Sequence, residues 1–222
     1  MARYEIRAKK KAAFQSLLNK IIMSEYEPGR ILTEKILAQE FQITRTTLKD
    51  FLHRLELMKL VELIPRVGIK ITNIDFNALL KDYEVKIYLE QMAATLAARH
   101  MNADQIKKIG DLINEMKTLY SDLPKLIQQD LLIHKMIYAN CRNETLEYFL
   151  DVLQSRILRL IVKLFKATDL VMDQEQPGLK QLKEFHKMLV ERDSEKAGLY
   201  FIEHSKATFD AIRQKLASES YF

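Results

Sequence analysis

The feature that most constrains the fold of this sequence is a change of hydrophobic period near residue 60. Before it, apolar residues recur at three- and four-residue steps in runs at about 10–23, 34–41 and 44–59, which predicts three helices. After it, Val61–Ile64 and Gly68–Thr72 are short β-prone runs on either side of a turn at Pro65. Residues 61–72 are therefore expected to form a small β-hairpin.

Local signals support these boundaries. Glu27-Pro28-Gly29 ends the first helical run, because proline and glycine both disfavour a continuing helix. Thr33 and Thr44 each stand immediately before a helical run, where a hydroxyl can accept a hydrogen bond from a free backbone N–H group. Three such helices followed by a β-hairpin predict a winged helix-turn-helix, whose third helix enters the major groove of DNA.

From Asp75 onward the sequence has only helical periodicity. Breaks at 101–102, 121–124, 140–143, 173–178 and near 193 divide it into about six segments, each with an apolar stripe. Such segments predict an all-α antiparallel bundle. The fold class is thus mainly α, with a winged helix-turn-helix domain at 1–73 and a helical effector-binding and dimerisation domain at 74–222.

The distribution of charge separates the same two parts. Residues 1–73 carry 14 Lys and Arg against 8 Asp and Glu, whereas the remainder carries 21 against 22. An excess of six positive charges suits a polyanion such as DNA. Cys141 is the single cysteine, so no internal disulfide is expected. Without a signal peptide or a long apolar run, we expect a soluble, cytoplasmic protein with no membrane partner.

The segment 31–71 resembles the GntR family of bacterial regulators. It reads ILTEKILAQEFQITRTTLKDFLHRLELMKLVELIPRVGIKI, and TRTTLKD stands in place of the family's S-R-T-P-V-R-E. It departs from the family pattern at Thr47 for Pro, Lys49 for Arg, Phe51 for Ala and Lys59 for Gly. The change at Lys49 matters most, because an ammonium group cannot form the two-pronged hydrogen bond by which arginine reads guanine.

The resemblance implies a set of DNA contacts. Arg45 is the expected base reader, Lys35 the expected phosphate contact, and the wing tip the expected minor-groove contact. The start of the third helix also suits phosphate, because its hydroxyls, free N–H groups and dipole all favour an anion. The predicted DNA-binding residues are Lys35, Thr44, Arg45, Thr46, Thr47, Lys49, Arg66 and Gly68. Simple helix capping is the alternative role for the threonines.

Residues 82–99 resemble the opening of the FCD domain, the C-terminal effector domain of the FadR subfamily, with Lys86 in place of the usual Arg. Many FCD domains hold a divalent metal through one Asp and three His. Asp130, His134 and His204 match three of these ligands. Leu182 occupies the position of the fourth, and His186 lies one turn later, which displaces a ligand by roughly 5 Å.

We therefore expect a regulator, not an enzyme, that binds a palindromic DNA operator as a homodimer and acts as a repressor. A small organic acid would modulate operator binding, bound in the C-terminal domain through a divalent Zn, Ni or Mn ion. Three alternatives stay open at this point. They are a metal-independent sensor of acyl-CoA or another ligand, an effector-blind architectural DNA binder, and a metal-dependent hydrolase with a DNA-binding appendage.

Overall fold

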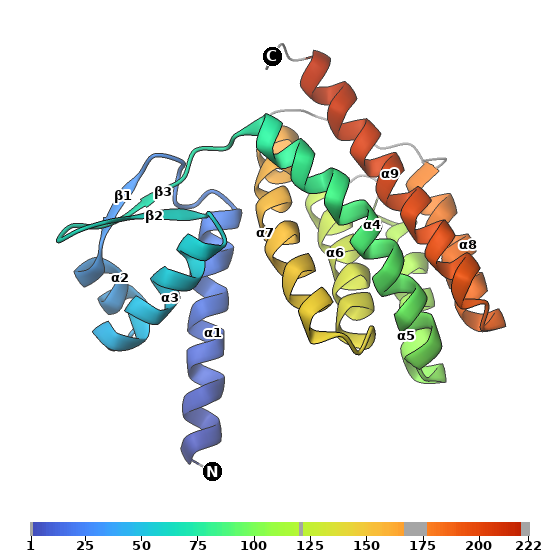
Figure 1. The fold of residues 1–222 in the computed structure, drawn as a ribbon, viewed down its shortest axis with the longest axis horizontal. Coiled ribbons are helices and arrows are strands. Elements are labelled where there is room, and N and C mark those ends of the chain that lie inside the picture. The colour runs from blue at the N-terminus through green and yellow to red at the C-terminus, as the bar shows by residue number, and fades with distance from the viewer. Residues whose placement is uncertain (1, 120–121, 167–176, 219–222) are drawn as a thin grey trace. The chain divides into compact units, whose positions relative to one another are not determined.

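The computed structural model describes residues 2–119, 122–166 and 177–218. Its described part forms two compact units, Met1–Leu79 with Ser155–Lys166 and Leu80–Gln154 with Ala167–Phe222. Figure 1 shows the elements in chain order: α1 (Ala2–Ile22), β1 (Ile31–Thr33), α2 (Glu34–Glu40), α3 (Arg45–Leu57), β2 (Val61–Ile64), β3 (Gly68–Ile71), α4 (Phe76–His100), α5 (Ala103–Met116), α6 (Leu123–Asn140), α7 (Glu144–Lys166), α8 (Pro177–Glu191) and α9 (Ser194–Ser218).

The first unit contains the three predicted helices and the predicted hairpin. The Oγ1 atom of Thr33 accepts the N–H of Ile36 at 3.3 Å at the start of α2, and that of Thr44 accepts the N–H of Thr47 at 3.2 Å at the start of α3. Both predicted caps are confirmed. The apolar faces of the helices meet in a core whose fully buried members include Leu17, Ile21, Leu37, Leu48, Leu55, Leu60 and Ile69.

Two details of the first unit differ from the sequence prediction. The first helix begins at Ala2 rather than near residue 10, because its charged opening favours a helix without supplying an apolar stripe. The sheet also has a third strand, since β1 pairs antiparallel with β3 to give the order β1-β3-β2. A strand of three residues is too short to show a period of two.

The extra strand β1 requires a glycine at position 68 of the hairpin. Gly68 is buried, has a φ of +149°, and pairs with Thr33 of β1. A Cβ atom at this position would lie 2.1 Å from the carbonyl oxygen of Leu32. Only glycine therefore lets β1 and β3 approach so closely, because any side chain would collide with backbone.

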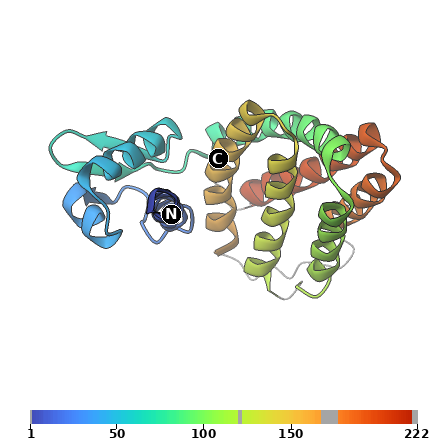
Figure 2. The same cartoon turned by 90° about the horizontal axis from the view of Figure 1, so that it is seen from below.

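The second unit is helical throughout its described residues, and the expected mainly α fold is confirmed. Figures 1 and 2 show α4 and α9 side by side, and Gly198 of α9 leaves no room for a Cβ beside Thr95 of α4. The chain reverses between α8 and α9, where Asp193 Oδ1 accepts the N–H of Lys196 at 3.1 Å. Asp193 is thus the N-cap of α9.

The predicted breaks near residues 101, 140 and 193 are confirmed by the ends of α4, α6 and α8. Residue 121 and residues 173–176, which belonged to two further breaks, lie outside the described residues. Among the described helices, none combines the length and the apolar composition that crossing a membrane requires.

Candidate metal centre and nucleic-acid interface

The residues predicted to contact DNA lie on α2, α3 and the hairpin turn of the first unit. Arg45, Thr46 and Lys49 are exposed on the first turns of α3, and Lys35 is exposed on α2. Arg66 is exposed in the turn between β2 and β3, with a φ of 65°. Together these residues place cations and the first turn of α3 on the surface of the unit, as phosphate contacts require.

Three of the predicted DNA-binding residues have structural roles in the first unit. Thr47 is 5 % exposed, and its Oγ1 atom accepts a hydrogen bond from the hydroxyl of Thr44 at 3.0 Å. Thr44 itself caps α3. Gly68 is buried against β1. The packing of the unit by itself therefore explains Thr44, Thr47 and Gly68, whereas it leaves Arg45, Thr46 and Lys49 on the surface.

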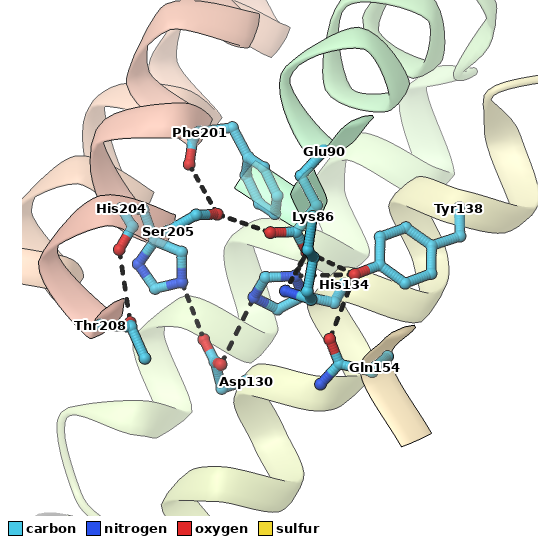
Figure 3. A network of polar contacts seen from close by, with 10 residues as sticks. All are labelled: Lys86, Glu90, Asp130, His134, Tyr138, Gln154, Phe201, His204, Ser205 and Thr208. Carbon is cyan, nitrogen blue, oxygen red and sulfur yellow. Dashed lines mark hydrogen bonds and ion pairs between the residues drawn. The ribbon is translucent and has the colours of Figure 1, made fainter. Parts of the chain in front are cut away.

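A buried cluster of polar side chains lies in the second unit (Figure 3). The helices α4, α6, α7 and α9 all contribute to it, and most of its members are almost fully buried. The residues of this cluster that make polar contacts with one another are Lys86, Glu90, Asp130, His134, Tyr138, Gln154, His204 and Ser205. So many buried polar groups require either mutual hydrogen bonds or a ligand.

Three of the four predicted metal ligands meet within this cluster. The Nε2 atom of His134 lies 3.4 Å from Asp130 Oδ2, and the Nε2 atom of His204 lies 3.2 Å from Asp130 Oδ1. One donor atom of each residue lies within 4.8 Å of the other two. Donors bound about 2.1 Å from one ion stand roughly 3.0–3.4 Å apart. The residues therefore fit a divalent metal, and Asp130 Oδ1 is buried without a hydrogen bond.

The second ring nitrogen of His134, Nδ1, contacts a different carboxylate, that of Glu90. His134 Nδ1 lies 2.5 Å from Glu90 Oε1, and Glu90 is completely buried. Lys86 Nζ also contacts Glu90 Oε1 at 2.7 Å, the Tyr138 hydroxyl donates to the same atom, and Ser205 Oγ donates to Oε2 at 2.7 Å. A proton on Nδ1 leaves Nε2 free to face Asp130, which is the arrangement that orients metal-binding histidines.

The charges of the cluster hold Glu90, Asp130 and His134 in their ionised forms. Burial would raise the pKa of Glu90, but Lys86 and His134 outweigh it and hold that pKa well below the ordinary value of 4.5. Burial likewise opposes ionisation of Asp130, and His134 and His204 keep its pKa well below 3.8. For His134 burial lowers the pKa, yet Glu90 and Asp130 together raise it to about 9. Without a metal, Lys86 and protonated His134 therefore balance the two carboxylates.

The fourth predicted ligand does not join the other three. His186 Nε2 lies 3.2 Å from the carbonyl oxygen of Ile106, and its ring packs over Gly110 of α5. Leu182, at the position of the family's ligand, is completely buried in the hydrophobic core. His186 therefore cannot serve as the fourth ligand. The helix α8 is regular, so a side chain one turn later cannot reach the place of Leu182.

Several members of the cluster were not assigned a role from the sequence. Lys86 and Glu90 are one turn apart on α4 and are 1 % and 0 % exposed. Opposite charges four residues apart inside an alanine-rich helical stripe are the signal that could have identified them, since charged residues are rarely buried unless paired. Tyr138 and Ser205 follow His134 and His204 on their helices, but the sequence carries no sign that both face Glu90.

Comparison with known proteins agrees with this architecture. Residues 9–71 match the profile of the bacterial regulatory proteins of the gntR family, and residues 82–207 match that of the FCD domain. The chain belongs to the GntR family. It is a GntR-type transcriptional regulator with a C-terminal FCD effector-binding domain, and not an enzyme. The hydrolase and architectural alternatives are thereby removed.

GntR relatives differ considerably in sequence. The chain is 27 % identical over 163 residues, 64 % of its length and 71 % of the relative's, to the uncharacterized HTH-type transcriptional regulator YieP of Escherichia coli. It is 25 % identical over 120 residues, 53 % of its length and 49 % of the relative's, to the gluconate operon transcriptional repressor of Bacillus subtilis. The solved structure of E. coli McbR/YncC has the same fold, with a TM-score of 0.76, 17 % identity and 93 % and 97 % coverage.

Proposed function

We propose that this GntR regulator represses transcription by binding a palindromic operator as a homodimer, and that a divalent metal in its FCD domain receives the carboxylate of a small effector. Residues 1–73 would bind DNA, and residues 74–222 would hold the effector and the dimer contacts. Two symmetric half-sites are expected because helix-turn-helix dimers place two recognition helices in successive major grooves. Repression agrees with the name of the B. subtilis relative, which also refers to an organic acid.

The arrangement of Asp130, His134 and His204 is the observation that carries the metal proposal. One carboxylate oxygen and two imidazole nitrogens form a three-ligand set on α6 and α9. A set of three protein ligands leaves further positions on the ion open for water or an incoming ligand. In a regulator, the carboxylate of an effector would occupy those positions on the ion, which its three protein ligands hold between α6 and α9.

The charges of the cluster favour an anionic effector. When a metal binds, His134 must release its proton, so that the cluster contains a divalent ion and Lys86 against Glu90 and Asp130. The cluster then has a net charge of +1, and the core of the second unit around it is apolar. A buried excess charge is costly, and a monocarboxylate would remove it. Effector binding would then act on DNA through a difference in affinity between two states.

On the DNA side, we propose Arg45 and Lys49 as groove-facing residues and Lys35, Thr46 and Arg66 as further members of the DNA-binding surface, with Thr44, Thr47 and Gly68 supporting it from within the unit. Arg45 is the best candidate for a base contact because it is exposed on the first turn of α3 and can donate two parallel hydrogen bonds. Thr44, Thr47 and Gly68 would serve it indirectly, by fixing the start of α3 and the position of the wing.

A metal-independent sensor is the second candidate, and one observation favours it. Glu90 and Asp130 raise the pKa of His134 to about 9, so protonated His134 and Lys86 offset the two carboxylates without an ion. A neutral, hydrogen-bonded cluster does not need an ion. In this version Lys86 and His134 would contact the effector directly, without a coordinated ion.

Metal analysis of the purified, untagged protein separates the two candidates. The metal proposal expects about one ion per chain, and an added Zn, Ni or Mn ion should raise the melting temperature of chelator-treated protein. His204→Ala should abolish both effects. His100→Ala is the matched control, because His100 is exposed at the end of α4 and outside the cluster. If the protein has no ion and no added metal raises its melting temperature, the metal proposal is wrong.

A further inference from the structure

A cavity lies in the first unit, beside the residues that lead from β3 into α4. Its volume is about 290 Å³, and its lining includes three cations, Lys59, Arg156 and Arg159, but only one carboxylate, Asp75. All four residues belong to the first unit. The lining of this cavity therefore has an excess of two positive charges, in a place that none of the DNA-binding or metal-binding residues occupies.

Arg159 is the most unusual of these groups because it is charged and buried. It is 4 % exposed, and its guanidinium donates to Thr72 Oγ1 at 2.9 Å and to the carbonyl oxygen of Thr72 at 2.7 Å. Both acceptors are neutral. Its Nε atom is buried without a hydrogen bond, and no carboxylate in the described part of the chain pairs with it. Buried charges normally have a counter-ion, so this guanidinium is suited to an anionic ligand.

The start of α4 adds to the positive character of the cavity. Ala78 and Leu79, in the first turn of this helix of 25 residues, belong to the cavity lining, and the first turn contains no acidic side chain. Asp75 caps the helix by accepting the N–H of Ala78 at 3.0 Å. The positive end of a long helix favours an anion, and here it stands beside the three cationic side chains.

We propose that this cavity binds a small phosphate-bearing anion, either inorganic phosphate or a phosphate monoester. Arginine and lysine side chains, here Arg159 and Lys59, bind phosphate oxygens through charge-assisted hydrogen bonds. The volume of about 290 Å³ lies at the lower end of the range for small-molecule sites. The site is separate from the Asp130 cluster and does not depend on the metal proposal.

The ligand would act on the end of the predicted recognition helix. Thr72 Oγ1, which Arg159 contacts, donates to the carbonyl oxygens of Lys59 and Leu60 at 3.0 Å each. Lys59 and Leu60 form the turn between α3 and β2, and Lys59 has a φ of 56°. An anion that binds Lys59 and Arg159 together would hold this turn, and thereby raise the stability of the DNA-binding unit.

The test uses the full chain after metal removal, without DNA. Inorganic phosphate or glycerol 3-phosphate is titrated against chloride at equal ionic strength, and the melting temperature is measured. We expect a saturable rise. Lys59→Gln should weaken the apparent affinity by roughly two- to fivefold, as for one exposed charge. Asp75→Asn should strengthen it, because asparagine retains the cap and removes the single negative charge. A tighter response to the ester identifies a metabolite site, and an equal response identifies a phosphate site.

Two controls make the result specific. Lys11→Gln removes an exposed positive charge of α1 outside the cavity and should leave the response unchanged. Arg45→Ala removes a cation from the predicted DNA surface. If Arg45→Ala abolishes the response while Lys59→Gln and Asp75→Asn do not change it, the anion binds the DNA surface and the proposal is wrong. It is also wrong if neither anion gives a saturable rise. Arg159→Met, where it folds, should remove the response.

Discussion

Glu90 on α4 and His134 on α6 approach to 2.5 Å, although 44 residues separate them along the chain. This contact places a fully buried carboxylate behind a histidine whose other nitrogen faces Asp130. The contact therefore joins the Lys86–Glu90 ion pair of α4 to the proposed metal ligands of α6 and α9. Glu90 would thus affect both the stability of the metal-free cluster and the proposed binding of a metal.

Replacement of Glu90 by Gln should weaken metal binding. An amide cannot hold the Nδ1 proton of His134 as strongly as a carboxylate, so the Nε2 atom is less basic and less well oriented. Loss of such a partner lowers metal affinity by roughly 10- to 100-fold. Competition with a chelator of known affinity measures this change. Glu203→Gln is the control, since Glu203 is exposed on α9 and pairs with Lys206; equal affinities in the two variants would contradict the role of Glu90.

The metal-free protein should lose stability as the pH rises from about 6.5 to 9. The folded-state pKa of His134 is raised to about 9 from 6.5, so its contribution is complete below the unfolded value and disappears as pH passes the folded one. The contribution is at most about 3 kcal/mol. Glu90 and Asp130 have lowered pKa values, so their contribution is present above about pH 4.5 and is lost in acid.

Urea unfolding of chelator-treated protein between pH 5 and 10 measures this dependence. His134→Gln should flatten the curve between pH 6.5 and 9 while leaving the loss in acid in place. His53→Gln is the control, because His53 is an exposed residue of α3. A wild-type curve that stays level over the alkaline range would show that His134 is not protonated in the folded protein.

Arg45→Ala should reduce specific operator binding by about 1–3 kcal/mol and relax the base preference at one position of each half-site. Lys35→Ala should instead weaken binding to all sequences alike and lower the salt dependence by about one phosphate contact. Gel-shift series at several salt concentrations separate these two effects. Lys107→Ala, an exposed lysine of α5, should change neither, and an unaltered base preference in Arg45→Ala would refute the assignment of the recognition helix.

Gly68→Ala should destabilise the first unit much more than Gly29→Ala. Both glycines have positive φ values, 149° and 83°, so each alanine is strained by about 1–3 kcal/mol. At Gly68 the new Cβ would also meet the carbonyl oxygen of Leu32 at 2.1 Å, whereas at Gly29 the nearest atom is 3.7 Å away. Melting temperatures of the two variants compare these costs. Equal losses would show that the tight pairing of β1 with β3 is not the reason for glycine at position 68.

Local patterns were sufficient for most of the helices and for the two hairpin strands. The helix α3 was recognisable from Thr44 as a cap and from apolar residues at three- and four-residue steps, because both signals depend only on neighbours along the chain. The strand β1 was missed because three residues carry no detectable period. Its existence depends on pairing with β3, at residues 68–70, which is a contact between distant segments.

For the candidate metal site, too, the sequence predicted one part, and the packing of the helices decided the rest. Asp130 and His134 share a helix face four residues apart, so their proximity follows from helix geometry alone. The arrival of His204 beside them, and the failure of His186 to join, depend on how α8 and α9 pack against α5 and α6. Helical spacing cannot supply that information, because it does not state which helices become neighbours.

The change of hydrophobic period near residue 60 thus predicted the passage from the three N-terminal helices to the hairpin, and later breaks in the apolar stripes predicted most ends of the C-terminal helices. These features arise from the preferences of short segments for burying one face. Only the tertiary structure decided that Glu90 stands behind His134, that Thr47 and Gly68 are buried, and that Arg159 faces neutral acceptors. These relationships depend on close packing between segments far apart in the chain, where a displacement of one helical turn exchanges a ligand for a core residue.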